Sequence, residues 1–265
     1  MRLPATRSLL IEGLVGIIAV LITSISRADK IPPDYVVLRC TLSPDRHFGV
    51  LVPKTDELDK LEETTGAQNQ VIDLATGNVI AVIRTRWVGA TRHNHGGVLP
   101  ARWSADNSLL LWQVDGKWFH DAVVLLKFSN NKLDWQADIT RVAQAECLFR
   151  TRRAEPKLYA LAMADNVRDG EAYPDGFSIQ VSVIGDIKLP LRVRATLTSD
   201  PKALGKPPLL ESSLVGVVDS AGRFQVTDFT VSRGLWKNYV EDAADAGVGD
   251  QRCQSGDIYI PPTSK

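Results

Sequence analysis

Residues 103–113, WSADNSLLLWQ, place a tight polar turn directly before an apolar strand in this 265-residue chain. Ser, Asp and Asn favour turns because their side chains hydrogen-bond to nearby backbone N–H groups. An apolar run bounded by turn residues is typical of a strand. We therefore expect Val98 to Trp103 and Ser108 to Gln113 to be strands joined by the turn Ser104-Ala105-Asp106-Asn107.

The same order of strand, turn and strand recurs on both sides of this segment. Upstream, proline stands at the second position of the turn Ser43-Pro44-Asp45-Arg46, where its fixed φ is favourable. Gly77 and Asn78 tolerate positive φ, so they predict another hairpin turn. The other strands expected in this half are Tyr35 to Leu42, His47 to Val52, Gln70 to Leu74, Val79 to Ile83, Trp118 to Phe128 and Leu133 to Ala137.

Three of these units resemble the strand-turn-strand units of WD-like β-propeller repeats in bacterial exported proteins: Ser43-Pro44-Asp45-Arg46, Val71 to Asn78, and Trp103 to Trp112. In that family the Asp and its neighbouring Ser tighten the turn between blade strands. The resemblance covers residues 36–138 and implies binding without chemistry. Because a blade takes about 40–45 residues and at least four blades are usual, we expect a partial, propeller-like meander whose exposed edge is covered by the rest of the chain.

After Asp138 the pattern changes to helices and then returns to strands. Apolar residues at helical spacing predict a helix over Thr140 to Arg153, and Pro156 favours the first position of a second helix through Ala164. Strict alternation then predicts antiparallel strands with one buried face, which the helices are expected to cover. These strands are Phe177 to Val183, Leu191 to Thr198, Leu214 to Val218 and Arg223 to Val231.

The predicted fold class is therefore mostly β (α+β): an antiparallel meander, a short helical segment and a second antiparallel sheet. The expected divisions are a signal peptide over 1–28, a propeller-like β-meander over 29–138, a helical segment over 139–170, an antiparallel sheet over 171–235 and a surface tail over 236–265.

The first 28 residues are typical of an export signal. Arg2 and Arg7 precede an apolar run from Leu14 to Ile25, and Ser26-Arg27-Ala28 offers small residues for cleavage. The alternative is a permanent anchor, but a Glu-Gly pair shortens the apolar run to about 12 residues, whereas a membrane span needs roughly 20. We expect an exported protein, periplasmic or extracellular, with no membrane contact after cleavage.

The charge balance and the cysteines of the chain indicate which partners and which disulfide bonds to expect. Acidic and basic residues balance at 31 each, which disfavours nucleic acid as a partner. Three widely spaced cysteines do not form a disulfide framework, so burial as three small apolar side chains is the favoured interpretation. If one bridge forms, we expect it between Cys40 and Cys253, because Cys147 falls within a predicted helix.

Motifs that carry chemistry are sparse. We find no nucleophile elbow, phosphate loop, Cys-x-x-Cys or dinucleotide fingerprint, and we expect no metal or cofactor. His93 and His95 could share a metal if a carboxylate or His120 came near, but the adjoining Asn and Gly favour a tight loop. Trp112 and Trp118 flank a turn and could stack on a ligand, although burial in a core is the commoner use of tryptophan. These five residues are the candidate ligand-binding residues.

Residues 255–259, Ser-Gly-Asp-Ile-Tyr, resemble the Ser-Gly-x-x-Tyr loop of bacterial envelope lysozyme inhibitors, which enters the cleft of the enzyme. The resemblance is confined to these five residues. It implies that Ser255, Gly256 and Tyr259 would form an inhibitory loop.

Three classes of function remain open. We favour a non-catalytic binding or structural module of the cell envelope, whose ligand could be a protein or a small molecule. The alternatives are an inhibitor of a cell-wall lytic enzyme and a hydrolase with an unrecognised site. A hydrolase would have to bring residues such as His95, His120 and Asp121 together.

Overall fold

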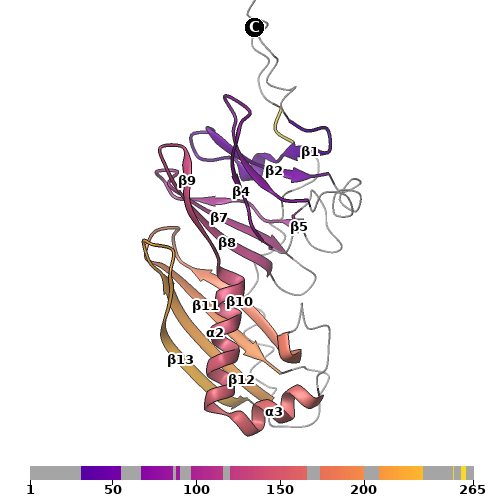
Figure 1. Cartoon of the computed structure of the whole chain (residues 1–265), viewed down its shortest axis with the longest axis vertical. Coiled ribbons are helices and arrows are strands. Elements are labelled where there is room, and N and C mark those ends of the chain that lie inside the picture. The colour runs from indigo at the N-terminus through magenta and orange to yellow at the C-terminus, as the bar shows by residue number, and fades with distance from the viewer. Residues whose placement is uncertain are drawn as a thin grey trace, which may run out of the picture.

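The computed structural model describes residues 31–54, 67–85, 88–89, 97–115, 120–165, 174–199, 209–234, 253 and 258–260. The predicted signal peptide, residues 1–28, lies outside the described residues. Within them the fold is mostly β, as predicted, with three antiparallel sheets and two α-helices (Figure 1).

The first two sheets come from the predicted meander. The strands of the first sheet follow one another in the order of the sequence: β1 (Tyr35–Val37), β2 (Phe48–Pro53), β3 (Gln70–Asp73) and β4 (Val79–Val82). The middle sheet has the order β5-β7-β8-β9, with β6 also paired to β7. Its strands are β5 (Gly97–Val98), β6 (Arg102–Trp103), β7 (Leu109–Asp115), β8 (His120–Ser129) and β9 (Lys132–Asp138).

Strand β7, in the middle sheet, is buried on both faces. Side chains alternate across a strand, so neighbouring residues of β7 enter different cores. Leu109 and Leu111 belong to the core shared with the C-terminal sheet, whereas Leu110 and Trp112 belong to the core shared with the first sheet. This double burial explains why β7 is an almost continuous apolar run.

The C-terminal sheet has the order β10-β11-β12-β13 and is covered by helix α2 (Figure 1). Its inward residues, such as Ile179, Val193 and Leu214, share one buried cluster with Ala143 and Cys147 of α2. The prediction that the helices cover this sheet is therefore confirmed. The bounds are α2 (Ile139–Ala154), α3 (Pro156–Asp165), η4 (Pro174–Gly176), β10 (Ser178–Ile184), β11 (Leu191–Thr198), β12 (Leu209–Val218) and β13 (Phe224–Gly234).

Strand β9 contacts both flanking sheets, and its last residue caps the first turn of helix α2. Its Gln136 donates to the Val82 carbonyl (3.1 Å) and accepts from the Arg84 N–H (2.8 Å) of the first sheet's last strand and its extension. The neighbouring Trp135 Nε1 donates to the Ser220 carbonyl in the β12–β13 turn (3.2 Å). Asp138 then caps α2 by accepting from the third helical N–H. One short strand thus contacts both flanking sheets.

Two predicted strands are interrupted in the structure. The segment predicted as Tyr35 to Leu42 ends as β1 at Val37 and continues as the 3-10 turn η2 (Arg39–Thr41), where Thr41 Oγ1 donates to the Leu38 carbonyl (2.7 Å). This local side-chain bond competes with the strand ladder. The segment predicted as Val98 to Trp103 divides into β5 and β6, because Pro100 lacks the N–H that a ladder needs.

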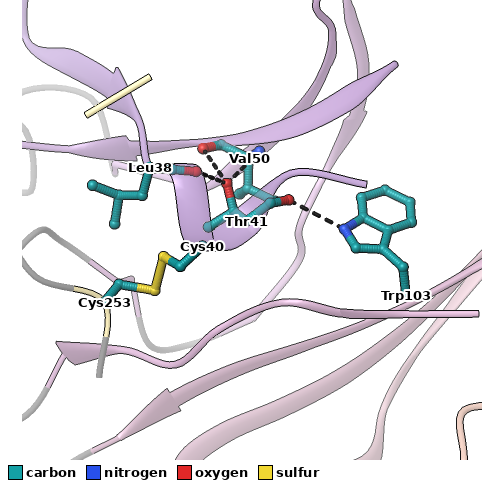
Figure 2. The surroundings of a disulfide bond; sticks show 6 residues. All are labelled: Leu38, Cys40, Thr41, Val50, Trp103 and Cys253. Carbon is teal, nitrogen blue, oxygen red and sulfur yellow. Dashed lines mark hydrogen bonds between the residues drawn. A yellow bond between two sulfur atoms is a disulfide. The ribbon is translucent and has the colours of Figure 1, made fainter. Parts of the chain in front are cut away.

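A disulfide joins Cys40 to Cys253, which lie 213 residues apart in sequence (Figure 2). The predicted pairing is confirmed, and the favoured interpretation of three unpaired cysteines was wrong. Cys147 remains free and is fully buried in α2. The described residues of the predicted surface tail are anchored, because Ile258 bridges to Leu38 and the Tyr259 N–H donates to the Val37 carbonyl (2.7 Å).

Candidate functional site

Two hairpin turns of the meander share one hydrogen-bond pattern. In the turn Ser43–Phe48, the Ser43 hydroxyl donates to Asp45 Oδ1 (2.6 Å) and accepts from the Phe48 N–H (2.9 Å). In the turn Ser104–Leu109, the Ser104 hydroxyl donates to Asp106 Oδ1 (2.6 Å) and accepts from the Leu109 N–H (2.9 Å).

The backbone of the two turns repeats as well. In each turn the serine N–H donates to the carbonyl five residues ahead, and the residue three after the serine has positive φ, 57° at Arg46 and 58° at Asn107. Each aspartate also accepts from the N–H two residues after it. Ser-x-Asp therefore specifies the same six-residue turn in the first and the middle sheets.

A third turn lies beside these two. Asn130 and Asn131 connect β8 to β9 with φ values of 51° and 59°, the positive pair that suits a two-residue hairpin and that asparagine adopts more easily than most residues. The three turns together line a polar groove of about 540 Å³. We call it the turn groove; its lining residues are Asp45, His47, Phe48, Asp106, Asn107, Ser108, Phe128, Ser129, Asn130 and Asn131.

Stacked aromatic rings hold the turns in place beneath the turn groove. The rings of Phe48, Trp103 and Phe128 stack on one another with centroids 5.9–6.1 Å apart. The indole of Trp103 also donates to the Thr41 carbonyl (3.1 Å), as Figure 2 shows. Phe48 and Phe128 are each only 4% exposed, so they form the rigid base of the groove and leave ligand contacts to the polar residues.

Both aspartates of the turn groove favour the ionised state. The hydrogen bonds from Ser104 and Ser108 lower the pKa of Asp106 below the ordinary value. Desolvation raises the pKa of Asp45, but hydrogen bonds from Ser43 and the His47 N–H, together with the His47 ring, outweigh it and lower the pKa overall. The groove thus presents two carboxylates that carry charge at neutral pH.

At the edge of the groove, His47 links its own turn to the hairpin of β3 and β4 and to the hairpin of β8 and β9. Its Nε2 lies 3.4 Å from Asp73 Oδ2, in the β3–β4 turn, and 3.3 Å from Asn131 Nδ2, in the β8–β9 turn. The ring also packs edge-on against Phe48. His47 therefore positions the loops relative to one another.

The described part of the turn groove presents mainly carboxylate and amide groups. The Ser43 and Ser104 hydroxyls are buried and already donate to their own aspartates, so neither is presented as a nucleophile. Among the described residues, no three His, Cys, Asp or Glu side chains lie close enough together to hold a metal ion. Exposed carboxylates and amides are suited to accept hydrogen bonds from a polar ligand.

Most of the residues predicted as ligand-binding cannot be placed. His93, His95 and Trp118 lie outside the described residues, as does the side chain of His120. Trp112 is described and is 0% exposed in the core between the first and middle sheets, so the interpretation of this tryptophan as a core residue is confirmed and its candidacy as a ligand-binding residue was wrong. Its place in β7 explains this, because that strand is covered on both faces.

The candidate inhibitor loop is described only at its end. Ser255 and Gly256 lie outside the described residues. Tyr259 is half-buried and packs against the outer cluster of the first sheet, formed by Val37, Leu51, Ile72 and Leu74. The described contacts of Tyr259 are thus with its own chain.

The turn groove was not predicted as a site, although its turns were. Asp45 and Asp106 were each recognised as turn residues. The repeated Ser-x-Asp spacing was the signal in the sequence, because hairpins with the same turn placed on facing sheets can bring their tips together. The contact of His47 with Asp73 has no such signal, since it depends on the packing of three hairpins.

Comparisons with protein-family models, curated proteins and solved structures found no match for the chain. In the described part of the chain, neither the length nor the hydropathy of any helix is that of a membrane span.

Proposed function

We propose that this chain is an exported, non-catalytic binding module of the cell envelope and that the turn groove is its ligand-binding surface. The observation that carries the proposal is the convergence of three hairpin turns on one groove whose carboxylates and amides point to a ligand rich in hydrogen-bond donors. Ligand sites commonly occupy loops held by a rigid scaffold, here the stacked aromatic base.

Two features support the proposed export of the protein. The first is the leader-like sequence of residues 1–28. The second is the Cys40–Cys253 disulfide, because such bonds persist mainly in oxidising compartments. The balanced charge of the chain is consistent with a partner other than nucleic acid.

Co-sedimentation with an insoluble envelope fraction tests the proposal. The groove variant combines Asp106→Asn with Asn131→Gly, because asparagine retains the acceptor that the turn needs and glycine retains the positive φ. The control is Asp219→Asn in the β12–β13 turn, where the carboxylate also accepts from nearby backbone N–H groups but does not line the groove.

We expect wild type and the Asp219→Asn control to sediment with the envelope and the groove variant to sediment at least several-fold less. Equal sedimentation of all three proteins would show that the groove does not bind the envelope. Cell fractionation of the wild type tests export separately, and retention in the cytoplasm would contradict it.

A further inference from the structure

The third cysteine of the chain lies between the two bridged cysteines in the sequence. Cys40 pairs with Cys253, and Cys147 stands almost midway between them. Three pairings are therefore open to the unfolded chain, and the native pair is the one that closes the longest loop. Loop closure becomes less probable as length to the power of about −3/2, so each wrong loop, half as long, forms about threefold more readily. On loop length alone, about one chain in seven would form the native bridge first.

Burial protects the Cys147 thiol from disulfide exchange only once the chain has folded. Its thiol is 0% exposed in the core of the C-terminal sheet, with Sγ 3.6 Å from Ser212 Oγ. The Ser212 hydroxyl in turn lies 2.6 Å from Thr151 Oγ1, so polar partners surround the thiol in the packed state. Burial raises the pKa of Cys147, which further suppresses the reactive thiolate in the folded protein.

The two halves of the native bridge belong to a different core. Cys40 and Cys253 pack in the cluster between the first and middle sheets, whereas Cys147 packs beneath the C-terminal sheet. A bridge from Cys147 to either partner would keep α2 from completing that second core. A wrong disulfide formed early would therefore block folding, and folding could not by itself remove it.

We infer that this protein is a client of a thiol–disulfide isomerase, whose task is to move a bridge from Cys147 to the Cys40–Cys253 pair. The inference rests on the proposed export, because an oxidising compartment is where the wrong bridge would form. During export Cys40 and Cys147 emerge before Cys253, so the Cys40–Cys147 bridge is the first that an oxidase can make.

Only the first bridge requires an oxidant, and its later transfer involves no net oxidation. A disulfide-bonded oxidase first accepts two electrons from the Cys40 and Cys147 thiols and becomes a dithiol. An isomerase thiolate then attacks Cys40 Sγ, and Cys147 leaves as a thiolate and takes up a proton. The Cys253 thiolate attacks the same Cys40 Sγ, forms the native bridge and releases the isomerase as a thiolate.

Oxidative refolding of the full chain tests the inference. The reduced chain, unfolded in urea, is diluted into oxidised glutathione with or without a purified protein disulfide isomerase, and free thiols are alkylated at set times. Peptide mass spectrometry then measures the three possible bridges. Cys147→Ala has a single possible bridge, and Ser212→Ala is the matched control that loses the contact with Cys147 but keeps all three thiols.

For wild type and Ser212→Ala we expect bridges to Cys147 in most chains at early times and a several-fold faster rise of the native bridge with isomerase. For Cys147→Ala, which has no wrong bridge to rearrange, we expect isomerase to accelerate the native bridge several-fold less than in wild type. Native pairing in wild type from the first time point, at the rate of Cys147→Ala, would overturn the inference. The measurement uses no cells, so its outcome is independent of whether fractionation supports export.

Discussion

Removal of the Cys40–Cys253 disulfide should produce a large loss of stability. The bridge joins residues 213 apart and so encloses nearly the whole described chain in one covalent loop. In the chain-entropy treatment, a loop of this length lowers the entropy of the unfolded chain enough to stabilise the fold by about 5 kcal/mol at 25 °C. Proteins are commonly stable by only about 5–15 kcal/mol, so the bridge accounts for a third or more of the total.

The perturbation is the double substitution Cys40→Ser and Cys253→Ser. Both substitutions are made in a protein that also carries Cys147→Ala, because this change removes the free thiol and so prevents disulfide exchange. Urea unfolding followed by tryptophan fluorescence gives the midpoint for this protein and for the Cys147→Ala parent. With a urea dependence of about 2.5 kcal/mol per molar, a loss of 5 kcal/mol lowers the midpoint by about 2 M.

A reductant provides the matched control, because dithiothreitol should bring the parent to the midpoint of the double-serine protein and leave that protein unchanged. A midpoint shift below about 0.3 M would refute the reasoning. It would mean that the bridge does not restrict the unfolded chain, or that the segment around Cys253 contributes nothing to the cooperative unit.

Three further predictions concern single positions. Asp138→Ala should lower stability by about 1 kcal/mol because α2 loses its N-cap, whereas Asp138→Asn should cost far less; equal losses in thermal unfolding would contradict the cap. Gly222→Ala and Gly185→Ala each place alanine at positive φ, which costs about 1–2 kcal/mol. At Gly222 the new Cβ would also lie 2.9 Å from the Trp135 ring, whereas at Gly185 nothing lies within 4 Å. The urea midpoint of the Gly222→Ala protein should therefore fall further than that of the Gly185→Ala protein. The pKa of Asp106 is lowered on folding, so its ionisation stabilises the protein above about pH 4, the ordinary carboxyl range, and this gain is lost as the pH falls through the lowered pKa. The difference between the urea midpoints of wild type and Asp106→Asn should therefore be largest at pH 6 and shrink as the pH falls below about 4. A difference that does not depend on pH would contradict this.

The hairpins were predictable because their determinants are local. Serine, aspartate and asparagine specify each turn through bonds that span at most six residues, and alternation of apolar and polar residues specifies the strands of the C-terminal sheet. The helix pair was predictable for the same reason, with Pro156 at the first position of α3.

The burial of β7 and the grouping of the strands were not predictable in this way. Trp112 lies beside a predicted turn and was therefore also a candidate for stacking on a ligand, but it is covered because the first sheet packs onto that face. The meander was expected as one unit, but it divides into two facing sheets. Both outcomes depend on contacts between residues far apart in sequence.

By itself, the sequence determined the hairpin turns, the helix pair and the mostly β class of this protein. These follow from local bonding and from the period of apolar residues. The tertiary structure alone decided that β7 is buried on both faces, that Cys253 returns to the first sheet, and that three turns meet in one groove. Each of these depends on which apolar faces pack against one another. Because the hydrophobic effect is non-directional, an apolar residue does not by itself specify which distant residue it will contact.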